Sequence, residues 1–361
     1  MEQELLAAIE RDPEDPAPYL VYADWLQGRG DLRGELMTLQ NATEDRPGDH
    51  RISDAALDHV RAHAEYYLGE LAPLVDEPRS LKLGWRCGFI ASAISTSYRP
   101  WLQGRFEMSA ERVLATLLQL PSARFLTRLV AEPTNMIDAR FIAQAIAAYA
   151  PASLRELWIG PRDPQSALRD CELGELGGWE RFPQLRELRL HGDIERLDRL
   201  RLPALRSATI MLAGSARALR VMDDLIAADW PNLERLHLWN APLLATVEQL
   251  LEREHVLLGD LGIINCAFAD PVCRVIARSP IAAQLYRLSL ARGTLTDAGV
   301  EVLVEQRARF PSLATIDVSE TFVTAAGVSR LRTMAREVVA NDRRTGPPQV
   351  LIPQLLRDPD D

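Results

Sequence analysis

A pattern of regularly spaced leucines recurs along most of the chain and predicts its architecture. The spacing L-x-x-L-x-L, or a close variant of it, begins at Leu126, Leu154, Leu185, Leu205, Leu233, Leu258, Leu285 and Leu313. Successive side chains of a strand point to opposite faces, so the leucines are buried and the residues between them face outward. One such strand cannot bury its apolar face alone, so the copies are expected to stack into a solenoid with a parallel sheet.

The intervals between the copies predict how the chain returns from one strand to the next. They are 28, 31, 20, 28, 25, 27 and 28 residues long, and apolar residues at helical spacing fill most of them. Helices are predicted over residues 138–149, 215–228, 243–253, 269–278 and 296–309. The 20-residue interval from Leu185 to Leu205 is too short for a full helix, so the repeat is expected to be irregular there.

These units resemble leucine-rich repeats of the ribonuclease-inhibitor type. The resemblance rests on the recurring motif and on residues 285–331, LYRLSLARGTLTDAGVEVLVEQRARFPSLATIDVSETFVTAAGVSRL. It implies an α/β fold in which a curved parallel sheet forms the concave side and true α-helices form the convex side. The exposed strand face of such a solenoid is a ready binding surface.

The first 80 residues have the pattern of a small all-α module that precedes the repeats. Asp15 is suited to cap a helix that Pro16 begins, and Asp31 is suited to cap the next one. The predicted elements are a helix over 2–11, helices that start at 15–16 and at 31, a loop over 41–51, and a helical segment over 53–75.

Residues 12–40, DPEDPAPYLVYADWLQGRGDLRGELMTLQ, resemble the repeat-companion domain at the N-terminus of many myxobacterial and planctomycete proteins. The resemblance rests on D-P-E-D at 12–15, Y-A-D-W-L at 22–26 and the G-R-G-D turn at 28–31. It implies a bacterial protein whose N-terminal unit accompanies an array of repeats, and it brings no assigned reaction. Asp24 lies beside Trp25, but a local structural contact is expected of it rather than catalysis.

These patterns divide the chain into four parts. The predicted parts are an acidic helical module over 1–80, an N-terminal cap of the solenoid over 81–125, leucine-rich repeats over 126–340, and a C-terminal cap or tail over 341–361. Residues 81–95, LKLGWRCGFIASAIS, predict one or two strands that begin the sheet.

The outward-facing positions of the repeats supply a candidate binding surface. In copies two to six, several of these positions hold Trp, Met, Arg or other side chains of the types found at the centres of protein interfaces. A protein or peptide ligand is therefore predicted to contact Trp158, Arg189, His191, Met211, Arg235, His237, Trp239 and Ile264. The alternative is an ordinary scatter of apolar side chains on a solvated surface.

The distribution of charge narrows the choice of partners. The formal net charge is −10, and residues 1–80 contain 18 Asp and Glu against 7 Arg, which gives −11. The rest of the chain holds 33 acids and 34 bases. Binding of nucleic acid would need a basic surface and an acidic module disfavours anionic membranes, so neither partner is expected. The acidic start and the lack of any long apolar stretch predict a cytoplasmic location.

The sequence offers no candidate for catalysis, for a cofactor or for a metal ion. The four cysteines form no C-x-x-C, G-x-S-x-G is absent, and the surroundings of Lys82, the only lysine, do not match a Walker-A loop. His191 and His237 are expected to lie about 10 Å apart on strands separated by a third, too far for one zinc ion. His59 and His63 are interpreted as solvated helix residues.

Three functional hypotheses follow. The first is a non-enzymatic protein that binds a protein or peptide on its concave face. The second is a recruitment or regulatory subunit, in which the repeats hold a substrate and the acidic module docks a separate enzyme. The third, an active site in the helical module, would require Asp12, Glu14, Asp15 and Asp24 to do more than cap helices.

Overall fold

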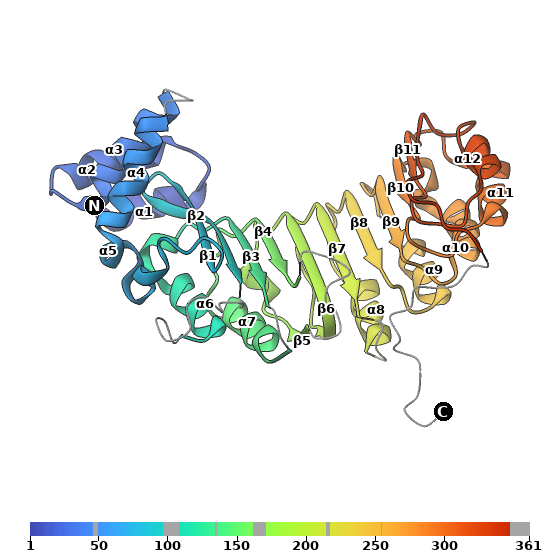
Figure 1. The fold of residues 1–361 in the computed structure, drawn as a ribbon, viewed down its shortest axis with the longest axis horizontal. Coiled ribbons are helices and arrows are strands. Elements are labelled where there is room, and N and C mark those ends of the chain that lie inside the picture. The colour runs from blue at the N-terminus through green and yellow to red at the C-terminus, as the bar shows by residue number, and fades with distance from the viewer. Residues whose placement is uncertain are drawn as a thin grey trace. The chain divides into compact units, whose positions relative to one another are not determined.

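The computed structural model describes residues 1–45, 50–96, 108–133, 136–161, 171–213, 217–253 and 255–346. The chain forms two compact units, Met1–Arg162 and Asp163–Asp361, here called unit 1 and unit 2. Each contains strands and helices (Figure 1). In the described part of the chain, no helix is long and apolar enough to cross a membrane. The division into four parts stays a prediction, and the boundary between the units lies within its segment 126–340.

Unit 1 begins with a group of helices. They are α1 (Glu2–Arg11), α2 (Ala17–Gln27), α3 (Leu32–Asp45), α4 (His50–Ala62), α5 (Ala64–Leu68) and the 3₁₀ segment η1 (Gly69–Leu74). The helix predicted over 2–11 is confirmed, and Asp31 accepts a hydrogen bond from the N–H of Arg33 at 2.8 Å at the start of α3. The predicted loop is wrong for residues 41–45, because α3 continues through them. The helical period predicted over 53–75 is broken at Gly69, whose φ of +52° ends α5.

The helices of unit 1 share one apolar core with its first strands. Tyr19 and Leu26 of α2 and Met37 of α3 are buried, on the faces that their helical spacing predicts. They belong to one cluster with Phe89 and Phe125, whose ring centroids lie 4.7 Å apart. Because the cluster draws on both parts, the helices and the strands of unit 1 stabilise each other.

A hairpin begins the sheet of unit 1. Strand β1 (Leu81–Arg86) is antiparallel to β2 (Phe89–Thr96), β2 is parallel to β3 (Arg128–Glu132), and β3 is parallel to β4 (Glu156–Ile159). The helices α6 (Ala110–Gln119) and α7 (Met136–Tyr149) connect these strands and pack against each other. The prediction of strands over 81–95 is confirmed. Their turn residues Cys87 and Gly88 both have positive φ, +46° and +76°, as a type I′ hairpin requires.

Helix α3 holds the tip of this hairpin. Arg33 Nη1 donates to the carbonyl oxygen of Gly88 at 2.5 Å, Arg33 Nη2 donates to Ser122 Oγ at 3.1 Å, and the N–H of Gly88 donates to Gln40 Oε1 at 2.6 Å. The Arg33 guanidinium is buried and lies 4.5 Å from the centroid of the Phe89 ring. These contacts fix the helical module on the first strands.

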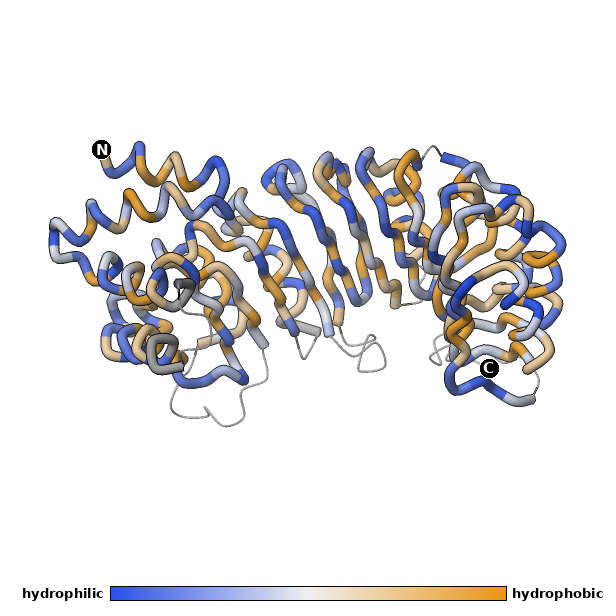
Figure 2. The backbone as a smooth tube through the Cα atoms, turned by 90° about the horizontal axis from the view of Figure 1, so that it is seen from above, coloured by the Kyte–Doolittle hydropathy of each residue, from blue (hydrophilic) through white to orange (hydrophobic). Residues whose placement is uncertain are grey.

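Unit 2 contains the strands that the leucine pattern predicts and, after the last predicted copy at Leu313, one further parallel strand, β12. Its parallel strands are β6 (Glu187–Leu197), β7 (Ser207–Leu212), β8 (Arg235–Trp239), β9 (Asp260–Ile264), β10 (Arg287–Ser289), β11 (Thr315–Asp317) and β12 (Glu337–Val339). Hydrophobic and hydrophilic positions alternate along them (Figure 2). The returns are α8 (Ala218–Ala227), α9 (Leu244–Glu252), α10 (Ala269–Arg278), α11 (Asp297–Glu305) and α12 (Ala325–Leu331). The predicted helices are therefore confirmed to within a few residues.

The repeat is irregular where its spacing is shortest. Strand β6 runs to Leu197 and β7 begins at Ser207, and residues 198–206, all of them described, form no helix between the two. The end of β6 instead pairs in parallel with an additional strand, β5 (Glu172–Leu176). The prediction that this interval is too short for a full helix is confirmed.

Candidate protein-interaction surface

The sheet of unit 2 has one buried face and one open face. Along β8, Leu236 and Leu238 are fully buried, whereas the alternate residues Arg235, His237 and Trp239 are at least partly exposed. The open face is the side of the unit 2 sheet that carries these alternate residues. Three of the predicted contact residues thus lie together on a single strand.

A buried carboxylate organises the centre of the open face. Asp260, the first residue of β9, is 1% exposed and accepts hydrogen bonds from Arg235 Nε at 2.7 Å and from His237 Nε2 at 2.9 Å. Burial by itself raises the pKa of the Asp260 carboxyl, but the hydrogen bonds from His237 and Arg235 outweigh burial, so the pKa is lowered. Gly262 leaves space for the imidazole, since a Cβ there would lie 2.9 Å from His237 Cδ2. Arg235 and His237 are therefore held in place by an ionised neighbour.

Replacement of this carboxylate by an amide is expected to destabilise unit 2. In Asp260→Asn the side chain carries no charge, and its NH₂ group faces two other donors. Hydrogen bonds to a charged group are worth about 1.5–3 kcal/mol, so a loss of about 2–3 kcal/mol is expected at pH 7. Because the folded-state pKa is lowered, the contribution of Asp260 is complete above its unfolded-state pKa, 3.8, and is lost as the pH falls through the lower folded value.

Urea unfolding of both proteins between pH 7 and pH 2 measures this contribution. The difference between the wild type and Asp260→Asn should be constant above about pH 5 and should shrink at lower pH. Glu187→Gln is a suitable control, because Glu187 pairs with Arg189 at 2.5 Å where both side chains are substantially exposed. It should cost less than about 1 kcal/mol. An equal loss in the two variants would contradict the role given to Asp260.

Two further predicted contact residues, Arg189 and Trp239, lie on the open face. Arg189 of β6 lies two strands away from Arg235, with β7 between them. The ring of Trp239 lies 5.6 Å from the Arg292 guanidinium, which forms an ion pair with Glu320 at 2.8 Å. The indole is thus next to a cation that is itself paired, an arrangement that orders the Trp239 side chain.

Three predicted contact residues are buried, and their proposed exposure is wrong. His191 is 5% exposed, Met211 is 1% exposed and Ile264 is 6% exposed. They occupy the seventh position of their repeats, where His191, Met211, Trp239 and Ile264 lie opposite one another on successive strands. Neighbouring strands are about 4.8 Å apart, so large side chains in one such row cover each other. Among these four residues, Trp239 retains an accessible surface.

Trp158 belongs to unit 1 rather than to unit 2. It lies on β4, and its side chain is partly exposed. The remaining seven predicted residues are all on strands of unit 2. The interaction surface described below is therefore limited to the open face of unit 2.

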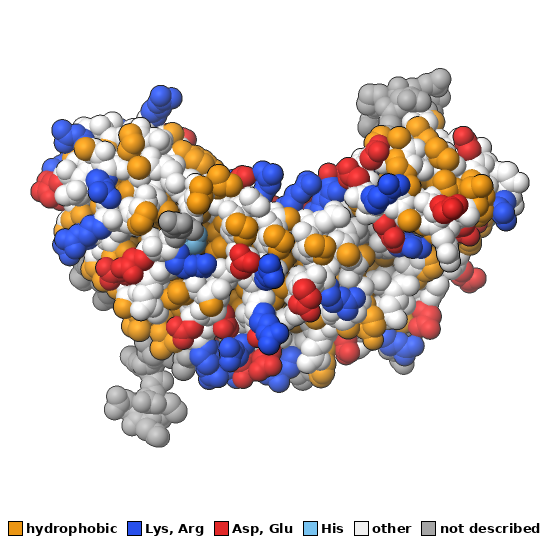
Figure 3. Space-filling model, turned by 180° about the vertical axis from the view of Figure 1, so that it is seen from behind, with side chains coloured by type: hydrophobic (Ala, Val, Ile, Leu, Met, Phe, Trp, Pro, Cys, Tyr) orange, Lys and Arg blue, Asp and Glu red, His pale blue; other side chains and the backbone are white. Residues whose placement is uncertain are grey.

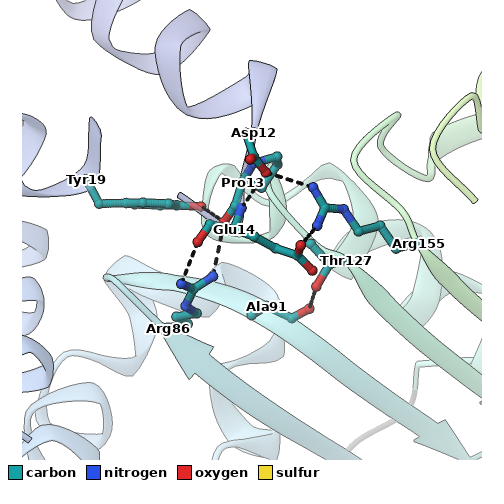
Figure 4. A network of polar contacts seen from close by, with 8 residues as sticks. All are labelled: Asp12, Pro13, Glu14, Tyr19, Arg86, Ala91, Thr127 and Arg155. Atoms are coloured by element: carbon teal, nitrogen blue, oxygen red, sulfur yellow. Dashed lines mark hydrogen bonds and ion pairs between the residues drawn. The ribbon is translucent and has the colours of Figure 1, made fainter. Parts of the chain in front are cut away.

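Asp12 and Glu14, which precede α2, form ion pairs and hydrogen bonds with arginines of other elements (Figure 4). Arg155 is buried and forms an ion pair with Asp12 at 2.9 Å and another with Glu14. Arg86 donates to the carbonyl oxygens of Pro13 at 3.2 Å and Glu14 at 2.9 Å. These contacts join residues far apart in the sequence, up to 143 positions, and sequence reasoning missed both arginines. They give Asp12 and Glu14 a role in attaching the helices to the sheet.

The histidines and cysteines have structural surroundings. His191 and His237 are on β6 and β8, which β7 separates, and in the described residues no three His, Cys, Asp or Glu side chains could hold a metal ion together. His59 is not solvated as predicted, because its Nε2 lies 3.1 Å from both the Leu32 oxygen and the Tyr67 hydroxyl. Burial raises the pKa of the Cys171 and Cys266 thiols to about 12, which makes them poor nucleophiles.

Basic and acidic side chains lie close together on the surface of both units. In the view of Figure 3, basic and acidic side chains are interspersed over the molecule. Several are paired with each other, as are Arg206 with Glu234 at 2.8 Å and Arg128 with Glu156 at 3.1 Å.

Comparisons with known proteins bear on the fold. No family model matches the chain, and no curated protein matches its sequence. A crystal structure of a Bacteroides fragilis protein is similar, with a TM-score of 0.62 and 18% identity over 72% of this chain and 77% of that chain. An internalin from Listeria monocytogenes also matches, with a TM-score of 0.30 and 10% identity over 74% of this chain and 84% of that chain. The first likeness shows a shared fold, and the second is too low to support an argument.

Proposed function

We propose that this chain is a non-enzymatic binding protein that holds a protein or peptide on the open face of unit 2. The observation that carries the proposal is the arrangement of Arg235, His237 and Trp239 on one strand, each at least partly exposed and each held by a neighbouring side chain. Groups that are ordered before binding lose little conformational freedom when a partner arrives. This pre-organisation favours recognition.

The same residues suggest what kind of segment binds. Arg235 uses its Nε for Asp260, and with 46% of its side chain exposed its Nη groups are available to a carboxylate or carbonyl oxygen of the partner. Trp239 offers apolar surface four residues farther along the same strand, about 13 Å from Arg235. Arg and Trp are the side chains that most often dominate the binding energy of an interface. An extended peptide segment with an acidic residue and an apolar residue about four positions apart suits this pair.

The proposal is tested by removing both side chains from the open face. A partner is first captured with the wild type from the native cell extract, and its affinity is then measured by calorimetry with each variant. Arg235→Ala/Trp239→Ala is expected to weaken binding at least tenfold, or about 1.4 kcal/mol.

A matched variant on helix α8, away from the strands, also removes one apolar side chain and one arginine, and serves as the control. Leu219→Ala/Arg220→Ala removes two exposed side chains of α8 and should leave the affinity unchanged. Equal affinity of the open-face variant and the wild type would exclude this surface. Circular dichroism should show that both variants keep the fold.

A further inference from the structure

The helical module of unit 1 contains a groove that the proposed function does not use. A cavity of about 210 Å³ lies between α2 and α3, lined by Leu20, Ala23 and Asp24 of α2 and by Met37 of α3. Cys87, from the turn between β1 and β2, also lines it. The cavity is large enough to accept a single apolar side chain rather than a drug-sized ligand.

Helix α2 is apolar on more sides than unit 1 buries. Tyr19, Tyr22, Ala23 and Leu26 form its buried face, yet Leu20 and Val21 on another face are 48% and 57% exposed. Leu20 lines the cavity and is nevertheless exposed, so the apolar contact there is incomplete, and a partner would complete it.

The surroundings of the groove are strongly acidic. Residues 12–45 include eight Asp and Glu and two Arg, a formal charge of −6. Asp24, which lines the cavity, is exposed, and its carboxylate forms no hydrogen bond or ion pair with any residue that the structure describes. A partner with a basic residue next to its apolar side chain would gain from this field and from a direct pair with Asp24.

The groove is also fixed in shape. A Cβ on Gly34 of α3 would lie 2.9 Å from the backbone nitrogen of Gln27 in α2, so these two helices are in close contact. Two hydrogen bonds, from Arg33 to the Gly88 carbonyl oxygen and from the Gly88 N–H to Gln40, hold the Cys87-Gly88 turn against α3. A site with such rigid walls binds without the cost of ordering them.

We propose that the groove between α2 and α3 binds a short amphipathic segment of another protein, with a large apolar side chain in the cavity and a Lys or Arg beside Asp24. The argument for this occupant is charge complementarity, since both a nucleic acid and an anionic membrane would be repelled. This second site would let the chain connect two proteins, as a recruitment subunit must.

The test is a selection of 12-residue displayed peptides against the full chain. Peptides that also bind Leu20→Asp/Asp24→Lys are removed first, so the remaining ones report on the groove. They are expected to combine a large apolar residue with Lys or Arg, and to bind that variant at least tenfold more weakly than the wild type. Leu243→Asp in unit 2, where the leucine is 50% exposed, is the matched control and should bind as the wild type does.

Alkylation of Cys87 provides an independent readout. Of the four cysteines, all of them described, Cys171, Cys266 and Cys273 are buried, and only Cys87 is partly accessible. A selected peptide should therefore slow the reaction of Cys87 with iodoacetamide as it occupies the groove. The open-face variant Arg235→Ala/Trp239→Ala should show the same protection, so failure of the proposed function would not affect this result.

Several outcomes would overturn the proposal. They are a failure to recover any groove-dependent peptide, recovery of acidic peptides, and an unchanged rate of Cys87 alkylation. A dimer of the chain that Leu20→Asp dissociates would assign the groove to a second copy instead.

Discussion

Removal of the chain beyond Gln284 is expected to abolish cooperative folding of unit 2 and to cause aggregation. The cut deletes β10 to β12 together with α11 and α12, which exposes the edge of β9 and the side of α10 that packs on α11. In the full-length chain, Leu261 and Ile263 of β9 are completely buried. In a solenoid each repeat depends on its neighbours, so the loss of three strands should exceed about 5 kcal/mol, comparable with the whole stability of a domain.

Specific bonds between repeats add to this loss. Asp270 at the start of α10 accepts hydrogen bonds from the Thr296 N–H at 2.8 Å and from the Thr296 hydroxyl at 2.6 Å. Asp297 and Thr324 repeat the arrangement one unit later, at the same two distances. The cut leaves Asp270 without these donors and leaves β9 with an unpaired edge, which promotes association between chains.

Size-exclusion chromatography and thermal unfolding measure the effect. The truncated chain should elute as large aggregates, and the cooperative transition of unit 2 should be absent. Co-expression of residues 285–361 as a separate fragment is the control, because a supplied cap should restore part of the soluble, folded protein. A monomeric truncation that unfolds at the wild-type temperature would contradict the dependence on stacking.

The strands and helices could be predicted because neighbours along the chain decide them. In β8, alternate residues differ sharply in burial, with Leu236 and Leu238 completely buried and Arg235 and His237 not. A period of two is enough to assign such a strand. In α2, likewise, the apolar spacing that predicts its buried face is visible within a dozen residues.

The degree of exposure on the open face could not be predicted in the same way. Alternation assigns a side chain to a face, but neighbours on adjacent strands decide how much of it solvent reaches. Met211 lies between His191 and Trp239 and is almost completely covered. The predicted contact residues likewise do not include Asp260, although it occupies an outward-facing position of its repeat and is in register with Arg235 on the preceding strand.

The contacts that attach the helical module to the strands of unit 1 could not be predicted either, because they join residues that lie far apart in the sequence. Arg33 bonds to Ser122, 89 residues away, and Arg155 bonds to Asp12, 143 residues away. A single arginine in a sequence does not show whether it is buried. The partners of Arg33 and Arg155 can be identified only when the fold places these distant segments next to each other.

The Gly88→Ala substitution is expected to destabilise unit 1 strongly, because it disrupts the contact between the β1–β2 hairpin tip and α3. Gly88 has φ of +76°, and a Cβ there would lie 2.5 Å from Met37 Cγ and 3.0 Å from Arg33 Cγ. The left-handed backbone costs an alanine about 1–2 kcal/mol, and overpacking adds about 1–3 kcal/mol. A total of about 2–5 kcal/mol should be lost from unit 1, because the hairpin tip must move away from α3 and lose its bonds to Arg33 and Gln40.

Gly30→Ala separates the two contributions. Gly30 has nearly the same φ, +68°, but no atom lies within 4 Å of a Cβ placed there, so this variant should lose only the backbone part, about 1–2 kcal/mol. Hydrogen exchange followed by mass spectrometry should show faster exchange across α2, α3 and the β1–β2 hairpin in Gly88→Ala than in Gly30→Ala, with unit 2 unaffected in both. Equal exchange in the two variants would mean that the hairpin tip is not held tightly by α3. The helical module would then be attached to the strands through the apolar cluster and the Arg155 ion pairs instead.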